Sequence, residues 1–298
     1  MKVYYFACIS AILLWSASFI ATKVAYETFA PIQLGVVRTG LAAIVFWIIR
    51  KIAKDKEKIK KEDRKRVAMS SLFGITLYFT LENIGVSMTS ASNAALIVAS
   101  FPAITSLLEF FVYRLKPTFQ KSVGIILAII GVAVLTQITI NGSVKSFWGN
   151  LILIGAGIVW AFYNFITRDL TNKYSALTLT HYQMLIGAIW FIPFVFFEAK
   201  PWRIPSVTSM NALIFLCIGC SVAAFVLYNF GLKKLSSSVS VSLMNLVPVL
   251  GLIFSVFILG EIVSLTQIIG GIIVIIGVIL SSVQVEVVSN ELKSNSTT

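Results

Sequence analysis

The sequence contains few charged residues and especially few acidic ones. Only 12% of its 298 residues are charged, with 12 Asp and Glu against 24 Lys and Arg, whereas a soluble domain carries about 25% charged residues. Histidine occurs once, as His181, and the three cysteines lie in apolar segments, which argues against a metal site or a redox motif. The hydrophobic share of 58% and the mean hydropathy of +0.92 instead predict an integral membrane protein.

Catalytic and nucleotide-binding motifs are also missing. The chain contains no H-E-x-x-H, G-x-S-x-G or Walker A sequence, and these are the patterns that zinc hydrolysis, serine hydrolysis and nucleotide binding use. The net charge of +12 is accompanied by no RNA- or DNA-binding motif, so nucleic acid is not an expected partner. We therefore predict that the chain is not an enzyme and that it needs no cofactor.

Ten apolar segments are long enough to cross a bilayer as helices of about 20 residues. They cover residues 3–22, 30–50, 67–87, 92–113, 120–139, 147–167, 176–197, 208–230, 238–259 and 265–285. Segment 50–66 is a basic loop, and residues 286–298 form a polar tail. If the basic loop is cytoplasmic, 19 Lys and Arg lie on that side of the membrane and 4 lie on the other. Such a bias predicts cytoplasmic termini in the inner (plasma) membrane.

The two halves of the chain, 3–139 and 147–285, resemble each other. With an offset of 145 Trp15 falls on Trp160, and with an offset of 146 FTLENIG falls on FVLYNFG. Each half contains five spans, an odd number, so the second half must insert in the opposite orientation. The sequence thus predicts an all-α membrane protein built from two inverted five-helix repeats around a central cavity.

Longer stretches resemble a known family. LLWSASFIATKVA and IVWAFYNFITRDL, at the start of the two halves, and ENIGVSMTSASNAALIVASFPAIT and LMNLVPVLGLIFSVFILGEIVSLTQIIGGIIVIIGV, later in them, resemble the EamA-type transporters of the drug/metabolite transporter superfamily. The resemblance covers about residues 3–285. It implies ten helices, two EamA repeats, and export or exchange of small metabolites such as amino acids. The sequence departs from the family pattern once, because the glutamate after the fourth helix of a repeat is present as Glu261 but is replaced by Leu115 in the first half.

Four ionisable residues fall well inside the predicted spans, where a charge costs from about 2.5 kcal/mol upward. They are Arg38, Glu82, Glu109 and His181. Glu82 and Arg38 enter from the same side, at depths of roughly 8 Å and roughly 12 Å, so the two side chains can meet. Glu82 could form an ion pair with Arg38, take part in a proton relay, or bind an amine of the substrate, and Arg38 could equally bind a substrate carboxylate. Glu109 and His181 are interpreted as structural residues.

Aromatic and neutral polar residues of the spans complete the candidate site, as walls and as hydrogen-bonding groups. They are Trp15, Tyr78, Asn83, Trp160, Tyr163, Asn164, Gln183, Tyr228 and Asn229. Gln183 stands at the position of Arg38 in the second half, which predicts an asymmetric site. Pro102 and Pro248, deep in the fourth span of each half, are predicted to interrupt their helices and to take part in gating. Glycines in the fifth and tenth spans predict close helix packing or a homodimer contact.

These features together predict a secondary transporter that moves small metabolites across the membrane by alternating access. Export of amino acids or related compounds is the favoured hypothesis, with the lipid bilayer as surroundings and protons as candidate coupling ions. An importer or exchanger of the same fold is the alternative. A membrane-embedded lipid-processing enzyme is less favoured, because it would need acids or histidines clustered at one interface, and the sequence scatters them.

Overall fold

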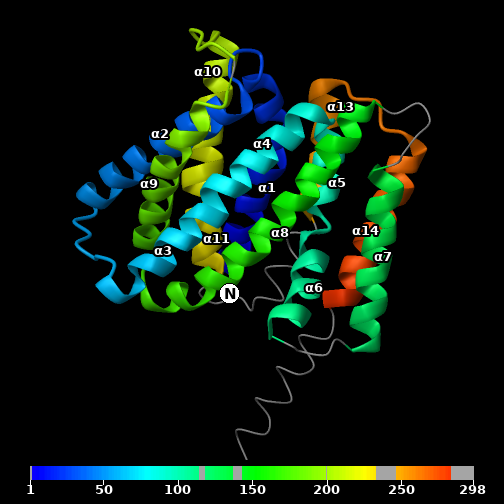
Figure 1. The fold of residues 1–298 in the computed structure, drawn as a ribbon, viewed down its shortest axis with the longest axis horizontal. Coiled ribbons are helices and arrows are strands. Elements are labelled where there is room, and N and C mark those ends of the chain that lie inside the picture. The colour runs from blue at the N-terminus through cyan, green and yellow to red at the C-terminus, as the bar shows by residue number, and fades with distance from the viewer. Residues whose placement is uncertain (1, 114–117, 137–142, 199, 233–245, 283–298) are drawn as a thin grey trace, which may run out of the picture.

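A computed structural model describes residues 2–113, 118–136, 143–198, 200–232 and 246–282 of the chain. Every regular element in these ranges is a helix (Figure 1). The prediction of an all-α protein is therefore confirmed. The polar tail at 286–298 and Leu115 lie outside the described residues.

The helices of the first half run up to residue 136. They are α1 (Lys2–Ala25), α2 (Pro31–Ile52), the 3₁₀ turn η1 (Lys61–Asp63), α3 (Arg64–Ser71), the π-helical segment η2 (Leu72–Leu77), α4 (Tyr78–Met88), α5 (Ala91–Val98), α6 (Phe101–Tyr113) and α7 (Phe119–Thr136). Those of the second half are α8 (Val144–Lys173), α9 (Ala176–Val195), α10 (Val207–Ile214), the π-helical segment η3 (Phe215–Ala223), α11 (Ala224–Leu232), α13 (Leu246–Leu259) and α14 (Leu265–Ser282).

Six helical stretches are long and apolar enough to cross a membrane. They are Lys2–Ala25, Pro31–Ile52, Lys61–Met88, Val144–Lys173, Ala176–Val195 and Val207–Tyr228, and four shorter apolar helices accompany them in the described part of the chain. Large apolar side chains such as Trp47, Ile189 and Ile192 are more than half exposed, as expected for a surface that faces lipid. The chain is thus a multi-pass membrane protein, while the count of ten spans stays a prediction.

Serine side chains begin several of the helices. Ser90, Ser143, Ser175 and Ser206 each accept a hydrogen bond from the backbone N–H three residues later, at the starts of α5, α8, α9 and α10. Such N-caps satisfy backbone donors that the first turn of a helix leaves without partners. They fix where these four helices start.

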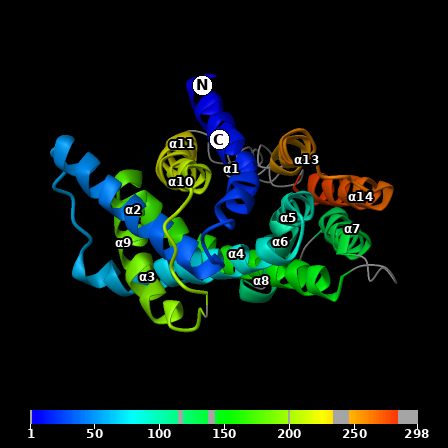
Figure 2. The same ribbon diagram turned by 90° about the horizontal axis from the view of Figure 1, so that it is seen from above.

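The helix pairs α2–α9 and α7–α14 lie at opposite ends of the molecule, with α1, α4 and α8 between them (Figure 2). Glycines bring α7 and α14 into backbone contact. A Cβ atom added to Gly131 would lie 2.6 Å from the Val274 nitrogen, and one added to Gly277 would lie 2.6 Å from the Gly124 oxygen. These glycines therefore serve packing within one chain, which is the first of the two roles predicted for them.

One of the two prolines predicted to interrupt helices, Pro102, lies in a first turn. The fourth span is divided into α5 and α6 by a turn at residues 99–100, and Pro102 is the second residue of α6. Pro248 lies in α13, and the residues immediately before this helix lie outside the described part of the chain. Proline is tolerated in a first turn, because the N–H that it lacks would have no partner there. The gating role of both prolines stays a prediction.

Candidate functional site

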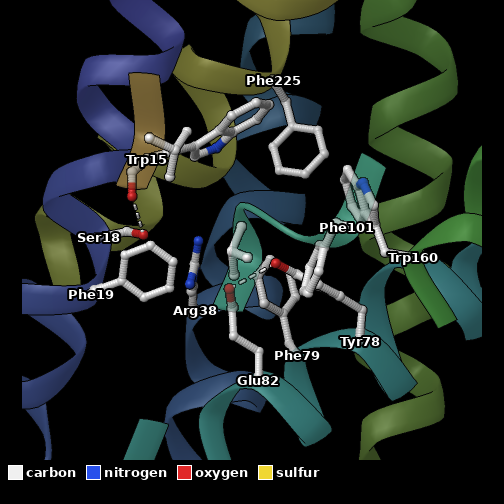
Figure 3. Close-up of a pocket in the computed structure, with 12 residues that line it drawn as sticks. Trp15, Ser18, Phe19, Arg38, Tyr78, Phe79, Glu82, Phe101, Trp160 and Phe225 are labelled. Carbon is white, nitrogen blue, oxygen red and sulfur yellow. Dashed lines mark hydrogen bonds between the residues drawn. The ribbon is translucent and has the colours of Figure 1, made fainter. Parts of the chain in front are cut away.

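A cavity of about 60 Å³ lies near the centre of the molecule, between helices of both halves (Figure 3). Most of the side chains around it are aromatic. The lining residues are Trp15, Ser18, Phe19, Arg38, Tyr78, Phe79, Glu82, Val98, Phe101, Trp160, Phe225 and Val247. One water molecule needs ~10–15 Å³ on this scale, so in this conformation the cavity has room for only a few waters.

Arg38, on α2, is the only basic residue in the lining among the described residues, and it is 3% exposed. Its Nε atom donates a hydrogen bond to Ser221 Oγ at 2.7 Å. Its guanidinium carbon lies 4.4 Å from the centre of the Phe79 ring, a cation–π geometry that helps to hold a desolvated cation. Figure 3 shows the guanidinium between the rings of Phe19 and Phe79.

The position of Ser221 depends on an unusual stretch of helix. Ser221 is fully buried and belongs to the π-helical segment η3. Such segments are rare, and they are frequent at functional sites, because the wider turn redirects side chains and frees carbonyl groups. In η3 the carbonyl of Cys220 accepts a hydrogen bond from the Trp15 indole N–H at 3.0 Å. The same segment therefore positions both Arg38 and one aromatic wall of the cavity.

Glu82, on α4, is the only acidic side chain in the lining within the part of the chain that the structure describes, and it is 9% exposed. Its Oε1 atom accepts a hydrogen bond from the Tyr78 hydroxyl, one helical turn earlier, at 2.7 Å. Tyr78 is itself held by the Trp160 ring, with the ring centres 4.9 Å apart. The carboxylate is thus fixed on one oxygen, and its second oxygen has no hydrogen-bond partner among the described residues.

Arg38 and Glu82 line one cavity but form no direct ion pair among the described residues. Their charges are close enough to interact electrostatically. The two terminal nitrogens of Arg38 donate no hydrogen bond within the described part of the chain, and they are not fully enclosed. The ion-pair alternative from the sequence is therefore not what the structure shows. Both charged groups keep hydrogen-bonding capacity that a ligand could use.

Of the other predicted residues whose side chains the structure describes, Trp15, Tyr78 and Trp160 line the cavity. Tyr228 lies behind Trp15, with ring centres 5.1 Å apart, and Tyr163 lies behind Trp160, at 4.9 Å. These two tyrosines support the aromatic walls from outside.

The polar candidates Asn83, Gln183 and Asn164 point elsewhere. Asn83 donates to the Pro31 carbonyl at 3.1 Å and so ties α4 to the start of α2. Gln183 is buried and donates to Ser70 Oγ at 3.0 Å. Asn164 is exposed and donates to the carbonyl one turn before it on α8. The side chains of Asn229, Pro102 and Glu109 lie outside the described part of the structure.

Sequence reasoning missed the supporting residues. Phe79 and Phe225 stand at the start of the repeated stretches FTLENIG and FVLYNFG, so the repeat itself was a signal for them. Phe19 and Phe101 had no such signal, because phenylalanine is common throughout the spans. Ser221 had none either, because a serine in an apolar span most often bonds to its own helix.

Comparisons with known proteins agree on one family. The profile described as "EamA-like transporter family" matches residues 2–137 and 147–283. The chain is 32% identical over 276 residues to the uncharacterized transporter YyaM of Bacillus subtilis, with 89% of each chain covered. It is 29% identical to an uncharacterized transporter of Archaeoglobus fulgidus, with 91% of this chain and 94% of the relative covered.

Two more distant matches add to this. A protein of Streptantibioticus cattleyicolor named a probable terminal-alkyne amino-acid exporter is 23% identical, with 92% of this chain and 91% of the relative covered. One crystal structure, 17% identical, superposes with a TM-score of 0.66 over 95% of this chain and 97% of its own. At that identity the superposition shows a shared fold.

Proposed function

This chain belongs to the EamA-like transporter family, whose members are membrane transporters and not enzymes, and we propose that it exports small zwitterionic metabolites by alternating access. Amino acids and compounds related to them are the proposed substrates. The observation that carries the proposal is the pair of opposite charges, Arg38 and Glu82, that face one aromatic cavity without bonding to each other.

A zwitterion matches this arrangement of charges. The planar guanidinium of Arg38 can receive a carboxylate through its two terminal nitrogens, since Nε is already occupied by Ser221. The second oxygen of Glu82 can receive an ammonium group, and the rings around it add cation–π attraction. A solute without charged groups would leave both Arg38 and Glu82 buried without a partner, which is costly. The site therefore favours a substrate that carries both charges.

The small cavity limits the size of the substrate. With room for only a few waters in this conformation, it favours a compact molecule over a multi-ring drug. The aromatic walls contribute apolar contact for a short side chain or an alkyl group. This agrees with the name of the distant relative from Streptantibioticus cattleyicolor, a probable exporter of an amino acid.

Glu82 also offers a simple mechanism of coupling. A carboxylate can hold a proton or an ammonium group, but it cannot hold both at once. If a proton replaces the substrate at Glu82 during the return step, inward movement of protons drives outward movement of the substrate. The Tyr78 hydroxyl, at 2.7 Å, keeps the carboxylate in place in both states. The predicted topology, with 19 Lys and Arg on one side of the membrane, favours a cytoplasmic position for the basic loop.

Uptake into proteoliposomes tests the proposal. The purified chain is reconstituted and supplied with L-alanine, with ethylamine, which lacks the carboxylate, and with propionate, which lacks the amine. Each compound is tested with and without an imposed pH gradient. We expect saturable transport of L-alanine that the gradient accelerates, and weak transport of the two analogues. Equal transport of all three compounds would rule out a zwitterion site.

Direction and coupling are tested in the same system. Accumulation of L-alanine in the acidic compartment, against its concentration gradient, identifies proton antiport, because protons leave that compartment as the substrate enters it, and hence export under cellular conditions. Transport that occurs only against preloaded substrate identifies an exchanger, which is the alternative for this fold. Glu82→Gln should lose the acceleration by the pH gradient. Acceleration that persists in this variant would assign coupling to another group.

A further inference from the structure

Two glutamates make matching contacts on opposite faces of the molecule. Glu57 lies in the loop that follows α2, and its Oε2 atom accepts a hydrogen bond from the backbone N–H of Ser175, at the start of α9, at 3.0 Å. Glu198 follows α9, and its Oε2 atom accepts a hydrogen bond from the backbone N–H of Ile32, at the start of α2, at 2.8 Å. Each of the two helices is thus bound at its start by a carboxylate from the segment that follows the other. We name these contacts the loop brace (Glu57–Ser175) and the far brace (Glu198–Ile32).

The loop brace is reinforced by neighbouring groups. Asp55 accepts hydrogen bonds from the Thr178 hydroxyl at 2.8 Å and from Arg50 Nε at 3.0 Å. The Tyr174 hydroxyl accepts a hydrogen bond from the backbone N–H of Lys60 at 3.2 Å. The loop after α2 is therefore bonded at several points to the junction of α8 and α9, which belongs to the other half of the chain.

The far brace is reinforced in a similar way. The Gln33 amide donates to the Lys200 carbonyl at 2.6 Å, and the Lys200 ammonium donates to the Phe29 carbonyl at 3.4 Å. The backbone N–H of Ser206 donates to the Thr28 hydroxyl at 3.4 Å. The segment after α9 is thus bonded to the junction of α1 and α2.

The two braces follow from the inverted repeat. With the offset of 145, the N-cap of α2, Ala30, corresponds to the N-cap of α9, Ser175. The two helices pack against each other, and the contacts at their ends show that they run in opposite directions. The end of each helix therefore lies beside the start of the other. A carboxylate there satisfies a backbone donor and interacts favourably with the positive end of the helix dipole.

A third glutamate makes a contact of this kind. Glu261 follows α13, and it accepts hydrogen bonds from the backbone N–H groups of Ala91 and Ser92, at the start of α5, at 2.9 and 3.0 Å. We name this contact the latch. The position that corresponds to Glu261 in the first half is Leu115, and a leucine side chain accepts no hydrogen bond. The first half thus lacks the carboxylate at the position that corresponds to Glu261.

We propose that the two braces join α2 and α9 into a rigid pair that keeps its geometry throughout transport, and that the face of the molecule that carries the far brace opens when the latch contact breaks. Opening between α2 and α9 would break charge-assisted hydrogen bonds and leave helix starts without partners on whichever face opens. Release at α5 and α13 breaks a contact whose carboxylate only the second half carries at this position of the repeat, which gives two states of different stability. This inference rests on the proposed alternating-access function.

Site-specific cross-linking tests the inference. In a variant whose three buried cysteines, Cys8, Cys217 and Cys220, are replaced by alanine, cysteine pairs are placed at both braces in one protein and at the latch in another. Each pair is joined by a short bifunctional methanethiosulfonate, and uptake of L-alanine is measured before and after reduction. A monodisperse gel-filtration profile before cross-linking shows that each variant has folded.

We expect the doubly braced protein to keep at least about half of its transport, and the cross-linked latch to lose transport about tenfold or more and to regain it on reduction, because a cross-link stops only motions that separate its two ends. Loss of transport in the braced protein that reduction reverses would overturn the rigid pair. Full transport with the latch cross-linked would overturn its role in opening.

Amide hydrogen exchange tests the same inference without any substrate. The N–H groups held by the braces and those held by the latch are compared in the uncross-linked protein in liposomes. We expect the latch amides to exchange about tenfold or more faster than the brace amides, because contacts that open in the cycle also open by fluctuation. Equal rates would overturn the inference. If the chain transports neither L-alanine nor its analogues, the proposed function fails, and exchange alone decides whether the pair is rigid.

Discussion

Replacing Glu82 by glutamine should weaken binding of the substrate amine and leave the shape and the walls of the cavity unchanged. Glutamine has nearly the same shape, and its carbonyl oxygen can still accept the Tyr78 hydroxyl that now lies 2.7 Å from the carboxylate. The change removes one negative charge from a cavity in which Arg38 is the other charged residue of the described lining. The walls of the cavity stay as they are.

The size of the effect follows from the bond that is lost. A hydrogen bond to a charged group contributes about 1.5–3 kcal/mol, and each 1.4 kcal/mol is about a tenfold change in affinity. We therefore expect the KM for L-alanine to rise between about 10-fold and about 150-fold in Glu82→Gln. The KM for ethylamine should rise by a similar factor. The KM for propionate, which has no amine, should stay within about threefold of wild type, since its carboxylate is bound by Arg38.

The reciprocal variant gives the opposite pattern. Arg38→Met removes the guanidinium and should raise the KM for L-alanine and for propionate, but not the KM for ethylamine. Glu27→Gln is the matched control for Glu82→Gln, because Glu27 is an exposed glutamate in the turn after α1. It should leave all three KM values unchanged.

The crossed pattern is what tests the reasoning. A general loss of folding or of expression would raise every KM or lower every rate together, and it would not distinguish amine from carboxylate. If Glu82→Gln raised the KM values for propionate and ethylamine by the same factor, then Glu82 would not be the amine site. The two charges of the cavity would then have a structural or electrostatic role.

Other parts of the fold yield three further predictions. Gly277→Val should lower stability by about 1–3 kcal/mol through overpacking against α7. Gly40→Ala should be neutral, because an added Cβ there would meet nothing within 4 Å. Thermal unfolding in detergent compares the two variants. Ser206→Ala should cost about 1 kcal/mol by removing the N-cap of α10, measured in the same assay. Burial opposes the ionisation of Asp55 and Glu57, but their hydrogen bonds outweigh it and hold the pKa of each carboxyl below its ordinary value. The stability that they contribute is complete above the ordinary carboxyl pKa near ~4 and is lost as pH falls through the lowered pKa, so the melting temperature should fall less steeply on acidification in Glu57→Gln than in wild type.

The sequence was informative about charge and about symmetry. Arg38 and Glu82 could be singled out because a charged residue in an apolar span is rare and needs a reason. Their depths, counted along the helices, predicted that they lie near each other, and both do line one cavity. The aromatic residues Trp15 and Trp160 followed from the repeat, since both align in the first span of their half.

The sequence could not predict how the two charges are held apart. Arg38 bonds to Ser221, 183 positions away in the chain, and stacks on Phe79. Both contacts depend on where side chains lie in the folded protein. The position of Ser221 depends on the π-helical segment η3, for which the sequence analysis had no pattern. The braces were missed for a different reason. Loop 50–66 was interpreted from its positive charges, which indicate topology. The specific contacts of this loop with the start of α9 are made by its acidic residues Asp55 and Glu57.

The comparison of Arg38 with Gln183 explains how a symmetric scaffold can hold a polar substrate in one orientation. Both residues occupy the same position of α2 and α9, and both are buried. Arg38 uses one nitrogen for Ser221 and keeps the others for the cavity, whereas Gln183 directs its amide nitrogen to Ser70 and Thr167 and lies outside the cavity lining. For the proposed zwitterionic substrate, the described lining offers one partner for the carboxylate, Arg38, and one for the ammonium group, Glu82. We therefore expect the substrate to have one orientation in the cavity whichever face is open.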